Sequence, residues 1–486
     1  MKKQSLPKAL AILFAMLIIF GGNIFAAEKI PITTESDQAK EYFIKARELA
    51  EKLRAQESLQ YYTKAIEEDP GFAVAYLNRA FNQTSAKAFF KDLNKAVALS
   101  NNVSEGERFQ ILAAEAGVNG NPKQQKKYLE KLVGMYPDDE RAHNLYGQYF
   151  FGQQEDEKAI EAYKKAIAIN PEFSQPYNQM GYAYRNLEKY DEAEKAFLKY
   201  IELIPDDPNP YDSYAELQLK IGNYDKSMIY YKKALAKDPD FAASRYGLAA
   251  NYIYLENYNE ARRVLEMMHD VAKTDGQKRT ALFGIACSYI DEGEMKEALR
   301  AIKKQYKIAE SNKDYAQMSG DLFNIATINY EMGNYNTAMD KFKESVAMFE
   351  KSAADKSLKE NAKMGLLVNE ANHAMRQKDF KTAEYKSEQF MERAKEKENP
   401  AQIRQAHQMQ AILALEQNDA AECLSHLKKA NQQNPYNLYR MAEAYKVKGD
   451  KKKAKEYYTA AKFFNALPNI NSSLARYRAN KALATL

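Results

Sequence analysis

The sequence predicts an all-α protein built as an array of repeats, and three observations support this prediction. A chain of 486 residues is longer than one compact core can organise, so several domains or a repeat array are expected. Gly (19) and Pro (14) are scarce, while Ala, Lys, Glu and Tyr are common, which favours long helices over sheets. Finally, Pro137, Pro171, Pro205 and Pro239 are each separated by 34 residues. A fixed period of this length indicates a solenoid.

The bulk composition is that of an ordinary folded protein. Apolar residues make up 45% and charged residues 28% of the chain, which excludes a mostly disordered polypeptide. The net charge of +5 includes Lys2, Lys3 and Lys8, and subtracting these three lysines leaves +2 for the rest. A nearly neutral body gives no reason to expect nucleic acid as a partner.

Residues 1–26 predict a cleaved signal peptide, followed by a short linker over 27–38. A basic start precedes an apolar run from Ala9 to Gly22, and the small residues Ala26 and Ala27 suit cleavage. The run is shorter than the roughly 20 residues of a spanning helix. We therefore expect a periplasmic or secreted protein with no membrane span in the mature chain. The alternative is an uncleaved inner-membrane anchor.

Other residues keep the 34-residue step of the prolines. Gly147 and Gly181 share one position of the period, and Ala159 and Ala193 share another. Small residues at these places let two helices approach closely, and a Pro after the second helix ends it. This pattern resembles the tetratricopeptide repeat family, and residues 174–207 form the best copy.

The resemblance implies a right-handed superhelical solenoid of about twelve antiparallel helix pairs. Residues 39–275 form a regular 34-residue array, 276–467 a longer-period array, and 468–486 a capping helix, as a solenoid end requires. We expect the junction of the two arrays at Val271–Lys278. The unit from Ala73 is weak because Asp92 occupies a position for a small residue, and the unit from Met364 is also weak. The expected units begin near Ala39, Ala73, Gly106, Glu140, Ser174, Pro208, Ala242, Arg279, Ser319, Met364, Arg404 and Pro435.

Residues 104–275 also resemble the tetratricopeptide blocks of bacterial signalling proteins. No kinase or cyclase motif accompanies them, so the resemblance implies a shared scaffold without a shared activity.

Residues that could support catalysis are sparse, and we expect no enzyme, no cofactor and no metal. None of the five histidines forms an i, i+4 pair or neighbours a cysteine at metal-ligand spacing. No phosphate-binding loop or nucleophile elbow occurs. Cys287 and Cys423 fall three repeats apart, which is too far for a disulfide, so two unpaired, buried thiols are expected.

The concave face of the solenoid is the expected binding site, since the resemblance places the first helix of each unit there. Amides on this face can pair with an extended peptide backbone, and tyrosines add rigid contact area. The alternative is that many of these residues form only a solvated polar face. A grip on a chain-terminal carboxylate is disfavoured, because Asp212 and Glu216 stand where cations would help. The candidate partner-binding residues are Asn144, Gln148, Asn178, Tyr182, Arg185, Asp212, Glu216 and Tyr246.

The C-terminal end is basic. Residues 436–486 hold eleven Lys and Arg against three acidic residues, a net charge of +8. This end either solubilises the array or docks on an acidic partner or an anionic envelope surface.

Together these features predict a non-catalytic scaffold of the bacterial cell envelope or secretion pathway that binds proteins or peptides in its concave groove. The alternatives are a periplasmic module for a small ligand or glycan, an N-terminally anchored assembly factor, and a cryptic enzyme.

Overall fold

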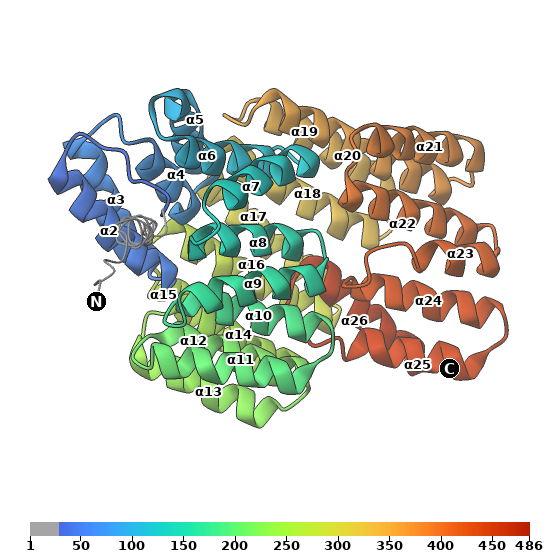
Figure 1. The fold of residues 1–486 in the computed structure, drawn as a ribbon. Helices are drawn as coiled ribbons and strands as arrows, with labels where there is room; N and C mark the ends of the chain where they lie inside the picture. Colours follow the sequence, from blue (N-terminus) through green and yellow to red (C-terminus); the bar gives the residue numbers. More distant parts are fainter. Residues whose placement is uncertain (1–28) are drawn as a thin grey trace, which may run out of the picture.

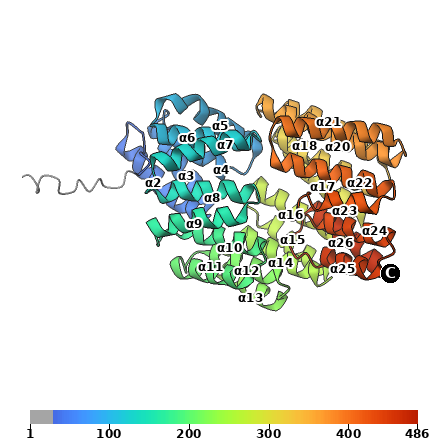
Figure 2. The same cartoon turned by 45° about the vertical axis from the view of Figure 1, so that its right-hand side comes forward.

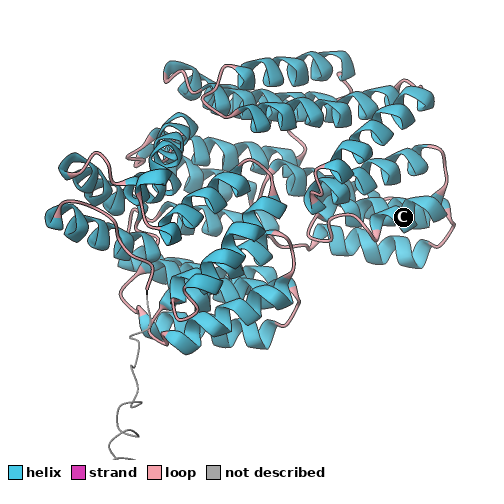
Figure 3. Cartoon of the chain, turned by 45° about the horizontal axis from the view of Figure 1, so that its top comes forward, coloured by secondary structure: helices cyan, strands magenta, loops and turns pink. Residues whose placement is uncertain are grey.

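The computed structural model describes residues 29–486, and over this range the protein is all-helical, with no strand (Figure 3). The predicted all-α class is confirmed. The predicted signal peptide over 1–26 and the first two residues of the linker lie outside the described residues. None of the helices within 29–486 is both long and apolar enough to cross a membrane.

Consecutive helices pack as antiparallel pairs, and the described residues contain twelve such pairs followed by one more helix, α26 (Figure 1). The number of pairs agrees with the prediction. The first seven pairs are α2 (Asp37–Glu51) with α3 (Ala55–Glu68), α4 (Ala73–Asn82) with α5 (Ala86–Leu99), α6 (Glu105–Val118) with α7 (Pro122–Met135), α8 (Glu140–Gly152) with α9 (Asp156–Ile169), α10 (Ser174–Asn186) with α11 (Tyr190–Leu203), α12 (Pro208–Lys220) with α13 (Tyr224–Lys237), and α14 (Ala242–Tyr254) with α15 (Tyr258–Asp270).

The remaining five pairs form a second arm, and its first seven helices are longer than any helix of the first arm. A short 3₁₀ turn, Ser100–Asn102, lies between α5 and α6 in the first arm. The pairs of the second arm are α16 (Asp275–Glu292) with α17 (Met295–Ser311), α18 (Tyr315–Glu331) with α19 (Tyr335–Glu350), α20 (Lys356–Arg376) with α21 (Phe380–Glu396), α22 (Pro400–Glu416) with α23 (Ala420–Leu427), and α24 (Pro435–Val447) with α25 (Lys451–Lys462).

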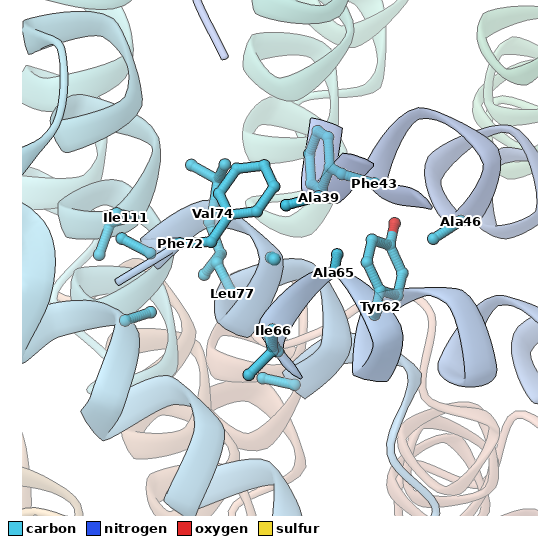
Figure 4. Close-up of a cluster of buried hydrophobic side chains, with 14 of the residues drawn as sticks. Ala39, Phe43, Ala46, Tyr62, Ala65, Ile66, Phe72, Val74, Leu77 and Ile111 are labelled. Carbon is cyan, nitrogen blue, oxygen red and sulfur yellow. The ribbon is translucent and has the colours of Figure 1, made fainter. Parts of the chain in front are cut away.

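The small residues of the repeat sit where two helices of a pair touch. A Cβ atom built on Gly147 would lie 2.4 Å from the ring of Tyr163, and one on Gly181 would lie 2.7 Å from the ring of Phe197. Both rings are fully buried. No Cβ atom fits at Gly147 or Gly181. The close approach of the two helices of a pair therefore explains why small residues recur with the period of the repeat. Figure 4 shows the corresponding contact of the first pair, where the ring of Tyr62 lies beside Ala46.

The weak unit that begins at Ala73 is a complete helix pair in the structure. The buried carboxylate of Asp92 accepts two hydrogen bonds from Arg79, at 2.7 and 2.8 Å, and one from Gln83 at 2.8 Å. A polar residue is tolerated there because its charge is paired.

The junction between the two arrays is shorter than predicted. Thr274 caps the N-terminus of α16, whose first turn contains residues 275–278. Only residues 271–274 connect the two arms. In the first four pairs of the second arm, the first helices start before the predicted units, and α20 begins at Lys356, eight residues before Met364. In the last pair, α24 begins at the predicted Pro435. The longer period therefore comes from longer helices.

The two arms lie against each other along a polar seam, as the views of Figures 1 and 2 agree. Turns of the first arm offer backbone carbonyls to side chains of the second. Asn399 donates to the carbonyl of Gly120 at 2.8 Å, and Arg404 donates to that of Gln153 at 3.3 Å. Gln154 donates to the side chain of Asn431 at 2.9 Å. The solenoid thus folds back on itself.

The predicted C-terminal helix is α26, Ile470–Leu483. It packs on α24 and α25 as a cap would, but it also packs on α16. Arg476, a residue of the basic end, is buried there and donates to the carbonyl of Ile253 at 2.8 Å. The expectation of a terminal cap was therefore incomplete, because α26 wedges between the arms.

Cys287 and Cys423 are unpaired and buried, as predicted. Burial raises the pKa of the Cys287 thiol to about 12 and that of Cys423 to about 11, so neither thiol is activated for chemistry.

Candidate binding groove

A groove of about 900 Å³ lies among the first four helix pairs. Its walls come from the first helices of these pairs, α2, α4, α6 and α8. These four helices stand side by side because each pair adds one layer to the array.

Apolar side chains line much of the groove, and some of them are exposed at its rim. Val74 and Leu77 of α4 are buried, whereas Phe81, one turn further along, is 57% exposed. Leu53, at the end of α2, is 49% exposed and also lines the groove. Large apolar side chains left open beside a concavity mark a binding surface.

Amide side chains supply hydrogen-bonding groups inside the groove. Gln110 and Gln148 line it and have no hydrogen-bond partner among the described residues. Asn144 donates to Gln175 at 2.7 Å, and its own carbonyl oxygen is buried without a partner within residues 29–486. Unused amides facing a hollow can accept and donate bonds to a peptide backbone.

An ion pair joins the first and fourth units across one end of the groove. Arg141 of α8 binds Glu51 of α2 through two hydrogen bonds, at 2.7 and 3.1 Å, and Glu140 at 2.7 Å. Burial alone would lower the pKa of Arg141, but the hydrogen bonds to Glu51 and the charge of Glu51 have the opposite effect, and the pKa is raised. Nearby, burial and the charge of Arg141 lower the pKa of Arg47, which makes no ion pair with any described residue. Arg47 is thus the free cation of this groove.

The residues before α2 form an extended strap along one edge of the groove. The backbone amide of Ile30 donates to Asp139 at 2.9 Å, and that of Thr33 donates to Glu107 at 2.7 Å. The hydroxyl of Thr34 donates to Asp69 at 2.5 Å. These three carboxylates stand near the N-terminal ends of α8, α6 and α4, so the strap crosses three units in succession.

The strap also places apolar side chains on the cores of these units. Ile30 packs against the cluster that contains Phe109 and Leu129, and Ile32 packs against the cluster that contains Phe72 and Ile111. Lys29, Ile30, Pro31 and Ile32 all line the groove. The first four units therefore bind an extended segment whose alternate residues point into their cores.

The predicted residues of the fifth and sixth units form a polar cluster instead of an open surface. Arg185 pairs with Glu216 at 2.5 Å, and the hydroxyl of Tyr182 donates to the same carboxylate at 3.0 Å. The guanidinium of Arg185 also lies over the Tyr182 ring, 4.6 Å from its centroid. Asn178 is buried, with its carbonyl oxygen unpartnered among the described residues.

Asp212 and Tyr246 are buried. Asp212 accepts a hydrogen bond from Ser244 at 2.6 Å, and burial raises its pKa to about 7. The hydroxyl of Tyr246 donates to the carbonyl of Pro468 at 2.5 Å, and that of Tyr254 donates to the carbonyl of Ala466 at 2.7 Å. The connector between α25 and α26 thus occupies the concave face of α14, and Tyr246 contacts the protein's own chain there.

Of the eight predicted residues, only Asn144 and Gln148 line the groove. The prediction missed the groove residues of the first three units. Asn144 and Gln148 are the fifth and ninth residues of the fourth predicted unit, and the same two positions include Arg47 in the first unit, Phe81 in the second and Gln110 in the third. The same positional rule, applied nearer to the N-terminus, would have found them.

Groups with possible chemistry are few in the described part of the chain. His407 and His426, 19 residues apart in sequence, meet with their Nδ1 atoms 3.0 Å apart, and His426 contacts Glu422 at 2.8 Å. The sequence spacing did not predict this pair. No cluster of three or more side chains within 29–486 is arranged to hold a metal ion.

The fold is therefore an α-solenoid of paired helices with one open groove and one self-filled concave face. Family models of the tetratricopeptide repeat match residues 147–188, 174–207, 218–277 and 436–462. The chain therefore contains tetratricopeptide repeats, as the sequence predicts. No curated protein sequence matches it.

Among solved structures, the chain is similar to the one titled "Crystal structure of APC/C hetero-tetramer Cut9-Hcn1". The two share 11% sequence identity with a TM-score of 0.41, over 93% of this chain and 80% of the other.

Proposed function

We propose that the groove of the first four pairs binds an extended segment of a partner protein, and that the chain is a non-catalytic interaction scaffold. The observation that carries this proposal is the strap. A segment of the same kind already lies across α4, α6 and α8, held through backbone amides and alternating isoleucines.

The groove has groups that can bind a second extended segment in the way that the strap is bound. Gln110 and Gln148 have amides to spare, Phe81 and Leu53 offer exposed apolar area, and Arg47 offers a positive charge. The best occupant is an extended aliphatic peptide with one carboxylate. Tetratricopeptide repeats generally bind proteins, and the matches to this family support the same class of ligand.

The setting of this function is part of the proposal. The basic and apolar start of the sequence supports export of the protein in a bacterium, so the scaffold would act in the cell envelope or in secretion. A groove of about 900 Å³ also lies within the roughly 300–1,000 Å³ of small-molecule sites. A small ligand or glycan is therefore the second candidate.

The test is a selection from a displayed library of twelve-residue peptides against the full-length protein, followed by fluorescence anisotropy with the enriched peptides. Phe81→Asp places a charge in the groove, and we expect it to weaken binding at least tenfold, about 1.4 kcal/mol. Tyr385→Asp is the matched control, since Tyr385 is also 57% exposed but lies on α21, outside the groove.

Enriched peptides that bind wild type and the Tyr385 variant equally, but bind the Phe81 variant weakly, support the proposal. Peptides that bind all three proteins alike argue against this groove. If no peptide is enriched and native mass spectrometry shows a bound small molecule, the second candidate replaces the first.

A further inference from the structure

The turn between α24 and α25 carries the densest group of exposed cations at the C-terminal end of the molecule. Six lysines are exposed within residues 446–456, and only Asp450 and Glu456 offset them, which leaves a net charge of +4. The turn lies at the outer edge of the molecule, away from the groove (Figure 1). The six are Lys446, Lys448, Lys451, Lys452, Lys453 and Lys455.

None of these six lysines forms an ion pair with any residue in the described part of the chain. The ammonium group of Lys453 lies over the ring of Tyr445, 5.0 Å from its centroid. The arginines of the same C-terminal region behave differently. Arg476 and Arg478 point inward and pair with Asp291 at 3.4 Å and Glu331 at 2.7 Å. The fold therefore uses Arg476 and Arg478 for internal structure and leaves these six lysines without an ion pair among the described residues.

Three of the lysines occupy places that are unfavourable for the helix itself. Asp450 caps α25, and Lys451, Lys452 and Lys453 form its first turn. The N-terminal end of a helix carries partial positive charge, so cations there are destabilising. Three successive lysines in this turn do not stabilise α25, which points to a role outside the fold.

The apex of the turn is apolar. Val447, the last residue of α24, is 46% exposed between Lys446 and Lys448. Below it, Tyr445 and Tyr457 stack with their ring centroids 5.4 Å apart. An apolar tip ringed by lysines can lie at a lipid interface, where the tip enters the headgroup layer and the cations meet anionic phosphates.

We propose that the α24–α25 turn docks the protein on a bilayer that contains anionic lipids. A projecting turn with an exposed apolar tip fits the flat surface of a bilayer. Lysines, which act as point charges, suit many interchangeable headgroups better than one fixed carboxylate geometry. This site is separate from the groove and does not depend on the function proposed for it.

The test is co-sedimentation of the full-length protein with vesicles of 30% phosphatidylglycerol in phosphatidylcholine, and with vesicles of phosphatidylcholine alone. Each lysine near an anionic surface contributes about fivefold to binding. The variant Lys451→Glu/Lys452→Glu/Lys453→Glu should therefore lose at least about a hundredfold. Acidic residues favour the first turn of a helix, so this variant should keep its fold.

The control is Lys164→Glu/Lys165→Glu/Lys232→Glu, which changes the total charge by the same amount on exposed faces of α9 and α13. Any contribution of the N-terminal leader is common to all variants and cannot separate them. The proposal expects binding that requires phosphatidylglycerol, falls with salt, and is lost in the first variant alone. Equal binding by the two variants would overturn the proposal, and so would a lack of preference of the wild-type protein for phosphatidylglycerol. The same results are expected if the turn binds an acidic protein instead of a lipid surface.

Discussion

The wedge formed by α26 gives a prediction about what holds the two arms together. Arg476 is 2% exposed and donates to the carbonyls of Ile253 and Tyr254, at 2.8 and 3.1 Å. Its guanidinium also lies 3.4 Å from the carboxylate of Asp291. Arg476→Met keeps much of the side-chain volume and removes the charge. Because Asp291 would remain buried without its cation, the loss should be about 3–5 kcal/mol.

The pH dependence of this loss follows from Asp291. Burial raises the pKa of Asp291 to about 6, although Arg476 lowers it. Without Arg476 the pKa must rise further. A raised carboxyl pKa means that the folded protein is more stable where the group is protonated, and that this stability is lost as the pH rises through the folded pKa. The variant should therefore lose more at pH 8 than at pH 5.

Hydrogen exchange measures this locally, since a solenoid need not unfold in one step. At pH 8, amides of α26 should exchange about a hundredfold to several thousandfold faster in Arg476→Met than in wild type. Arg476→Met/Asp291→Asn is the matched variant and should recover much of the protection. A change below about 1 kcal/mol, or an equal loss in the double variant, would refute the idea that this buried pair locks the arms.

Two further predictions concern buried groups of the first arm. Since burial raises the pKa of Asp212 to about 7, wild type should lose stability between about pH 4 and 7, and Asp212→Asn should remove up to about 4 kcal/mol of that fall. Chemical denaturation at pH 5 and pH 8 checks this, and parallel curves for both proteins would contradict it. Gly181→Ala should destabilise by about 1–3 kcal/mol, because its Cβ would meet Phe197 at 2.7 Å. Gly365→Ala, a helical site with nothing within 4 Å, should instead gain about 0.5–1 kcal/mol, so thermal melts of the two variants should shift in opposite directions.

Much of the fold could be predicted because each repeat carries its own local signals. Residues at the positions of Gly181 and Phe197 pack together in other units too, as Gly147 and Tyr163 do, so the spacing of small residues indicates the helix pairing directly. Unit starts such as Ala73, Glu140 and Ser174 coincide with helix starts in the structure. In the second arm the signal weakened, since longer helices such as α20 extend beyond the repeat and leave no fixed period.

The way the two arms pack against each other could not be predicted from the 34-residue period. Contacts such as Asn399 with Gly120 join residues far apart in sequence through single polar bonds, which leave no pattern. Tyr246 illustrates the consequence for the site. Its repeat position indicated the concave face correctly, but only the folded chain shows that Pro468 covers it. In the groove near the N-terminus, by contrast, the strap covers one edge, and Gln110, Gln148 and Phe81 line the hollow.

The central claim is that the groove of the first four pairs binds an extended protein segment, and photo-crosslinking tests it most directly. A library-selected peptide that carries a benzophenone group would be irradiated with the full-length protein, and the attached residues would be mapped by mass spectrometry. If the groove binds the peptide, crosslinks are expected within 74–82, 110–118 and 141–152, on α4, α6 and α8. Crosslinks confined to α18–α25, with none on these three helices, would contradict it.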